Sequence, residues 1–131
     1  MSNYKPTFYV HLLLCGDGFP GAFNFRQKYD LKTRRAILSQ VVLTKDQSNL
    51  VDELLAQHTD FDQKLLRARH EELLSCAKIA QGQNLSPSGV RYRLRNAEYI
   101  HRTDEHRYKL HSVRESISSQ IEAIVATLSV T

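Results

Sequence analysis

Cysteine is scarce in this sequence, which has two, Cys15 and Cys76, among 131 residues. They lie far apart in the chain, and neither has a second cysteine nearby. This excludes a disulfide framework and a zinc knuckle, both of which need several cysteines at short spacing. We therefore expect a cytoplasmic protein, in a reducing compartment, that holds no metal and no cofactor.

Long apolar runs are also lacking. The run FYVHLLLC at residues 8–15 is far shorter than the roughly 20 residues that a membrane-spanning helix needs. It does not fit a lipoprotein signal either, because His11 interrupts it and Leu14 precedes Cys15, where a small residue is required. We expect no contact with a membrane.

Patterns typical of catalysis are missing as well. The GDG at residues 16–18 lacks the flanking residues of a phosphate-binding or calcium-binding loop and favours a turn. His101, His106 and His111 match no common metal motif and are expected on the polar face of a hairpin. Because no nucleophile, base and orienting group can be assembled from neighbouring residues, we predict that the protein is not an enzyme.

What is present is ordinary for a globular protein. Hydrophobic residues make up 41% of the chain and charged residues 24%, which predicts a folded domain. The formal net charge is +4, and two basic segments, 1–43 and 81–111, flank an acidic one at 44–80. This balance fits an anionic partner without the dense positive charge of a histone-like protein.

The first part of the chain is expected to form a β-hairpin. TFYVHLLLC at 7–15 is rich in aromatic, β-branched and leucine residues and is followed by the turn formers GDGFPG. Both faces of such a strand would be apolar, which indicates burial on both sides. GAFNFR at 21–26 is the nearest partner strand. With helices further on, we predict an α+β fold that is mostly helical.

Helices are predicted from Asp30 to about residue 80. Asp30 is a candidate N-cap, and TKDQ at 44–47 has the form of a capping box. A further helix begins near Phe61, and the sequence leaves open whether 61–80 is one helix or two. Apolar residues near helical spacing support these elements: Leu31, Ile37, Leu38, Val41, Val42, Leu50, Val51, Leu54, Leu55, Leu65, Leu66, Leu73, Ala77 and Ala80.

The segment CAKIAQGQNLSPSGVRYRLR at 76–95 carries the clearest local signals. Gly82 and Asn84 tolerate the left-handed conformation of a tight turn. Ser86 is a good N-cap, and Pro87 suits the first helical position. On the helix that follows, Val90, Leu94 and Ala97 share one face and should be buried. The residues expected to point outward are Ser88, Arg91, Tyr92, Arg95 and Asn96, with Arg93 at the edge of the buried stripe.

This segment resembles the helix-turn-helix of bacterial and phage transcription regulators. That motif has an alanine on the first helix, a small residue in the turn, a polar N-cap and a β-branched anchor; here Ala80, Asn84, Ser86 and Val90 match. AEYIHR and RYKLH look like strands joined by TDEH, so 97–111 is expected to form a hairpin. That order is similar to a winged helix-turn-helix, although an acidic tip at 104–105 is unlike a DNA-binding wing.

The resemblance implies a sequence-specific, double-stranded-DNA-binding transcription regulator with a recognition helix at about 86–97. Ser86 begins the helix, whose N-terminus would meet a phosphate, with Gly89 permitting close approach. The candidates for contact with base edges are Ser88, Arg91, Tyr92 and Arg95. The candidates for contact with phosphates are Arg93, Arg102, Arg107 and Lys109.

Other functions stay open. One is a small phage- or virus-type protein that binds a host protein through its N-terminal region. Another is an RNA-binding protein that stacks bases on Tyr92, Tyr99 and Tyr108. RQKYDLKTRR at 26–35 is a second nucleic-acid contact or, more simply, a solvated helix start.

The last part of the chain bears on assembly. Ile117, Ile121, Ile124 and Leu128 recur at the spacing of a short helical packing seam. Such a seam closes onto its own domain or completes a dimer, and we expect a homodimer. The expected regions are thus 1–60, for dimerisation or for binding a partner or ligand; 61–111, for DNA binding; and 112–131, a packing or dimerisation helix.

Overall fold

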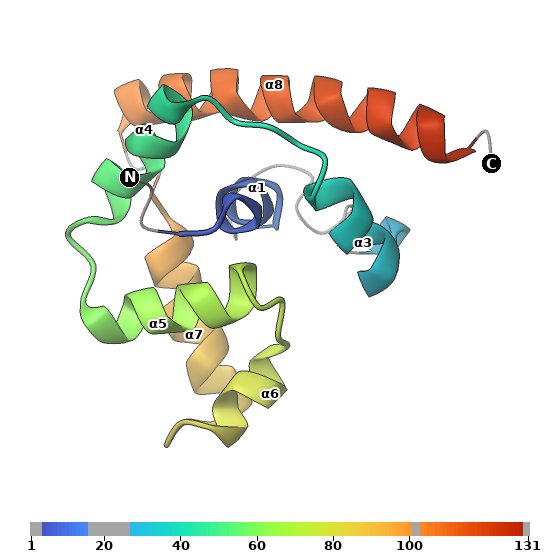
Figure 1. The fold of residues 1–131 in the computed structure, drawn as a ribbon. Helices are drawn as coiled ribbons and strands as arrows, with labels where there is room; N and C mark the ends of the chain where they lie inside the picture. Colours follow the sequence, from blue (N-terminus) through green and yellow to red (C-terminus); the bar gives the residue numbers. More distant parts are fainter. Residues whose placement is uncertain (1–3, 16–26, 101–102, 130–131) are drawn as a thin grey trace.

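The computed structural model describes residues 4–15, 27–100 and 103–129, and their regular structure is entirely helical. The expected α+β class is therefore wrong. The helices are α1 (Pro6–Cys15), α3 (Leu31–Leu38), α4 (Lys45–Leu55), α5 (Asp60–His70), α6 (Cys76–Gln81), α7 (Pro87–Glu98) and α8 (Asp104–Ser129). Figure 1 shows α1 end-on at the centre, between α8 above and α5 below, with α3 to one side.

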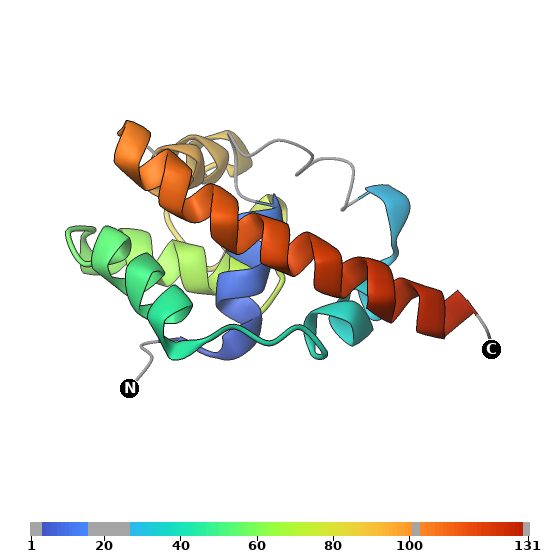
Figure 2. The ribbon, with the colours of Figure 1, turned by 90° about the horizontal axis from the view of Figure 1, so that it is seen from above.

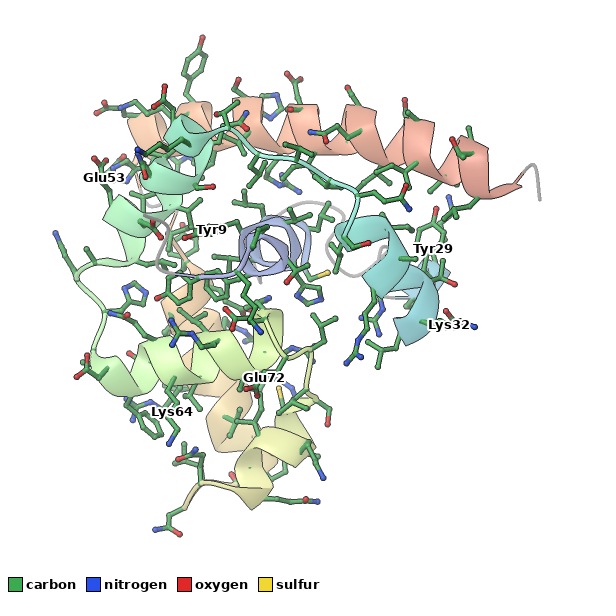
Figure 3. The ribbon with its side chains drawn as sticks, in the orientation of Figure 1. Tyr9, Tyr29, Lys32, Glu53, Lys64 and Glu72 are labelled. Carbon is green, nitrogen blue, oxygen red and sulfur yellow. The ribbon has the colours of Figure 1, made fainter. Side chains whose placement is uncertain are left out.

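Helix α1 replaces the predicted first strand, and the expected partner strand at 21–26 lies outside the described residues. Most of α1 is buried, and it packs against α3, α5 and α8. A helix that is covered on all sides needs no polar face, so its sequence loses the helical period. Tyr9 joins α1 to α4, since its hydroxyl donates to Asp52 Oδ1 at 2.7 Å (Figure 3). The inference of burial was right, and the inference of a strand was wrong.

The predicted caps of α3 and α4 are confirmed. Asp30 Oδ1 accepts from the Thr33 N–H at 2.8 Å. Thr44 and Gln47 form a complete capping box, with each side chain accepting from the other's backbone N–H. The expected apolar stripe of α3 is only partly right, because Leu31 is 40% and Val42 is 72% exposed. Helix α3 ends at Leu38, so Val42 lies in the connection that follows.

Residues 61–80 contain two helices, because the chain turns sharply between His70 and Cys76. Leu73 has a φ of 60°, a left-handed conformation that is costly for a leucine. Hydrogen bonds hold the turn: Leu74 N–H donates to Ala68 O at 3.0 Å, and Arg69 Nη1 donates to Leu74 O at 2.8 Å. Ser75 then caps α6 by accepting from the Lys78 N–H at 3.1 Å.

The predicted hairpin at 97–111 is wrong, because α7 extends through Glu98 and α8 begins at Asp104. Thr103 caps α8 by accepting from the His106 N–H at 3.1 Å. The acidic pair expected at a wing tip occupies the first turn of α8, where negative charge is favourable. Leu110, Val113 and Ile117 are buried at helical spacing. Of the three histidines expected on the hairpin, His106 and His111 stand on α8 and His101 lies outside the described residues.

Helix α8 closes the fold over α1. Ile117 is fully buried, and Ile121, Ile124 and Val125 pack against the core, so this stretch of the predicted seam closes onto its own chain. Arg114 Nε donates to Leu13 O at the end of α1 at 2.9 Å, and burial lowers the pKa of Arg114. Figure 2 shows α8 crossing the whole body and extending beyond α3. One buried cluster contains residues of all three regions expected from the sequence.

Candidate nucleic-acid interface

Helices α5, α6 and α7 form a three-helix unit in which α7 contacts both of the others. Ser86 Oγ accepts from the Gly89 N–H at 3.0 Å, and Pro87 occupies the start of α7, as predicted. The turn before α7 differs from the prediction: Gly82 has a φ of −94°, and Asn84 has no positive φ. The helix-turn-helix order therefore arises without a left-handed residue between α6 and α7.

The predicted faces of α7 are confirmed. Val90 is 0%, Leu94 3% and Ala97 3% exposed, so this side packs inward. The residues predicted to point outward are all exposed: Ser88, Arg91, Tyr92, Arg95 and Asn96. Arg91 and Arg95 lie one helical turn apart, and no ion pair of Arg91 is seen among the residues that the structure describes. Helix α7 thus presents two guanidinium groups and a 68% exposed Tyr92 on a firmly seated scaffold.

Arg93 differs from its neighbours because it is held within the three-helix unit. Its Nη2 lies 3.1 Å from Asp62 Oδ1 on α5, and its guanidinium carbon lies 4.7 Å from the centre of the Phe61 ring. The sequence placed Arg93 at the edge of the buried stripe, facing a phosphate or an acidic neighbour. The structure supplies the acidic neighbour.

The residues expected on the wing are not on a hairpin. Arg102 lies outside the described residues, and Arg107 and Lys109 stand on the first turns of α8. Arg107 pairs with Asp104, and Lys109 Nζ lies 2.9 Å from Glu105 Oε1. Their hydrogen bond, reinforced by the attraction of opposite charges, lowers the pKa of Glu105 and raises that of Lys109. Helix α8 begins at the opposite end of α7 from Ser86 (Figure 1).

A pocket that the sequence did not reveal lies beside the exposed face of α7. We call it the arginine pocket; its volume is about 380 Å³, and its lining includes Cys15, Arg69, Cys76, Arg91, Arg95 and Glu98. These residues come from α1, α5, α6 and α7. The spacing of Arg91 and Arg95 was visible in the sequence, but only the fold brings Arg69 and both cysteines to them.

A buried polar chain of three residues lies behind the pocket. His11 Nδ1 and His70 Nδ1 lie 2.8 Å apart, and His70 Nε2 is hydrogen bonded to the Glu98 carboxylate. The exposed fractions are 1% for His11, 0% for His70 and 4% for Glu98. Since two Nδ1 atoms at this distance share one proton, one ring donates and the other accepts. His70 is too buried to touch a ligand, so we assign this chain a structural role.

The described residues include no group of three or more His, Cys, Asp or Glu side chains arranged to hold a metal. Among the described helices, none combines the length and apolar character required to cross a bilayer. No protein-family model matches the sequence, and comparisons with curated proteins and with solved structures found no match.

Proposed function

We propose that the protein binds double-stranded DNA as a transcription regulator, with α7 lying in the major groove. The observation that carries this proposal is the outer face of α7: Arg91 and Arg95 are exposed one turn apart, while the opposite face packs on α5 and α6. An arginine on such a helix can bond guanine O6 and N7 together. Ser88 and Tyr92 lie on the same exposed side and are further candidates for base contact.

Phosphate contact is assigned to the N-terminal end of α7. A helix N-terminus favours an anion, and Gly89 in the first turn allows a DNA backbone to come close. A β-carbon at Gly89 would lie 3.4 Å from Ser86 Oγ and 3.7 Å from Leu85, which are ordinary contact distances. The fold therefore does not demand glycine at this position, and close approach of DNA would give it a use.

The arginines and the lysine that already have carboxylate partners are placed outside the reading face. Arg93 holds α7 against α5, and Arg107 and Lys109 pair along α8. A phosphate would have to compete with Asp62, Asp104 or Glu105 for them. We therefore expect these residues to add general electrostatic attraction without any sequence preference.

A cytoplasmic homodimer remains part of the proposal, because two-fold regulators place two recognition helices on successive major grooves. The seam on α8 is already packed against its own core as far as Val125, and Leu128 is 38% exposed beyond it. Measurement of the mass in solution, alone and with DNA, checks the dimer: one protomer per duplex would contradict it.

The proposal is tested by selection from random duplexes at controlled salt, followed by gel shifts. We expect enrichment of a defined sequence and an affinity that falls steeply as salt rises, because bound arginines displace counterions from DNA. Arg91→Ala with Arg95→Ala should remove the enrichment. Lys32→Ala is the control, since Lys32 lies on α3, away from α5 to α7 (Figure 3). Equal binding of every duplex by the parent protein would overturn the proposal.

A further inference from the structure

The arginine pocket carries more positive than negative charge. Its lining contains three arginines, Arg69, Arg91 and Arg95, and one acid, Glu98. Guanidinium groups present planar pairs of N–H donors that match the oxygens of a phosphate or carboxylate. Arg69 approaches from α5, while Arg91 and Arg95 come from α7. A phosphate among them would therefore be contacted from two helices.

The charges are arranged by depth. Arg91 and Arg95 are exposed and form the rim, whereas Leu94, Glu98 and Cys15 are buried and form the floor. The Glu98 carboxylate accepts from His70 Nε2, and an ionised carboxylate has further lone pairs for another donor. A ligand that was anionic throughout would meet repulsion at this floor. The arrangement suits an anion at the rim and hydroxyl groups beneath it.

The pocket is also partly preorganised. Arg69 Nη1 donates to Leu74 O at 2.8 Å, which fixes its guanidinium beside the α5–α6 turn. Leu94 is 3% exposed, so the helix that carries Arg91 and Arg95 is firmly seated. A volume of about 380 Å³ lies within the range of small-molecule sites. Little ordering of the backbone is needed for a ligand to bind.

We propose that the arginine pocket binds a small sugar phosphate, with its phosphate between the arginines at the rim and a hydroxyl donating to Glu98. Because Arg91 and Arg95 belong to both the pocket and the reading face, the bound ligand excludes DNA from α7. This regulatory consequence rests on the proposed function. Binding of the sugar phosphate does not.

Cys76 provides a test that involves no DNA. It lines the pocket and is partly exposed, so iodoacetamide can reach it, whereas Cys15 is 3% exposed. The full chain is alkylated with glucose 6-phosphate, glucose or inorganic phosphate present, and peptide mass spectrometry follows Cys76. We expect glucose 6-phosphate to slow the reaction several-fold, inorganic phosphate to slow it less, and glucose to leave it unchanged.

Two variants make the test specific, and each is compared with itself with and without the sugar phosphate. Arg91→Ala should lose the protection, and the fold should tolerate this change because Arg91 is exposed. Lys78→Ala should keep it, since Lys78 is exposed on α6 and does not line the arginine pocket. No protection of the parent protein, or equal protection of Arg91→Ala, would overturn the site. Equal protection by inorganic phosphate would overturn the contact with Glu98.

A competition measurement separates this inference from the proposed function. Glucose 6-phosphate is added to the protein on its selected duplex, with inorganic phosphate at equal ionic strength as the control. Release of DNA by the sugar phosphate alone supports the shared use of Arg91 and Arg95. Retained DNA together with a protected Cys76 would overturn that shared use. Protection of Cys76 in a protein that binds no duplex would support the pocket and contradict the DNA-binding function.

Discussion

The Nδ1 atoms of His11 and His70 lie 2.8 Å apart at the centre of the molecule, joining α1 to α5. Because His70 also bonds Glu98 through Nε2, this contact belongs to a chain that connects α1, α5 and the end of α7. The helix that carries the reading face is thus tied to the core by a buried polar contact as well as by apolar packing.

Loss of His70 should be costly to stability. His70→Ala leaves the Glu98 carboxylate buried without its imidazole partner, which we expect to lower the free energy of unfolding by about 3 kcal/mol. Glu98→Gln is the matched control, because an amide oxygen can still accept from His70 Nε2. Denaturant unfolding of both variants checks this. Equal losses would mean that the carboxylate charge, and not the contact, matters.

The histidine pair should also make the fold sensitive to acid. The chain from His11 to Glu98 can take up one extra proton, but a second would put N–H groups on both facing Nδ1 atoms. Unfolded histidines each bind a proton below about pH 6.5. The unfolded state then binds more protons, so stability is present at neutral pH and falls as pH drops. His11→Phe should flatten this dependence; an unchanged slope of unfolding free energy against pH would contradict the account.

Gly89→Ala separates the demands of folding from those of DNA binding. The added methyl group meets only ordinary contacts, and alanine is the better helix former. We expect the free energy of unfolding to rise by about 0.5–1 kcal/mol while affinity for the selected duplex falls. Thermal unfolding and gel shifts on the same samples measure both. Full affinity in the variant would place the DNA backbone away from the first turn of α7.

The Arg93–Asp62 pair should contribute little to stability. Both side chains are partly exposed, 43% for Arg93 and 25% for Asp62, so solvent screens their attraction. A double-mutant cycle with Arg93→Ala and Asp62→Ala should give a coupling of about 0.2–1 kcal/mol. Arg93→Ala should also leave the preferred DNA sequence unchanged. A shift in the selected sequence would assign Arg93 to the reading face.

What the sequence predicted well was local. The cap at Ser86, the capping box at Thr44 and the two faces of α7 depend on residues a few positions apart, and all are found in the structure. Helix α1 was mistaken for a strand because burial on every side removes its period. The start of α8 was mistaken for half of a hairpin, although its charges suit a capped helix with pairs such as Glu105 and Lys109.

The long-range features could not be predicted from spacing. His11 and His70 come from helices far apart in the chain, and the arginine pocket draws on α1, α5, α6 and α7. His11 was visible only as a polar residue inside an apolar run. A histidine at such a position needs a buried partner, but the sequence alone does not say which residue provides it.

The most direct test of the DNA-reading face is the ratio of affinities for the selected duplex and a scrambled one. Arg91→Ala with Arg95→Ala should reduce that ratio by roughly a hundredfold, since each bidentate base contact contributes about 1–3 kcal/mol of discrimination. Circular dichroism should show the fold intact, and Lys32→Ala should leave the ratio unchanged. If the double variant keeps the parent's ratio, α7 does not read DNA.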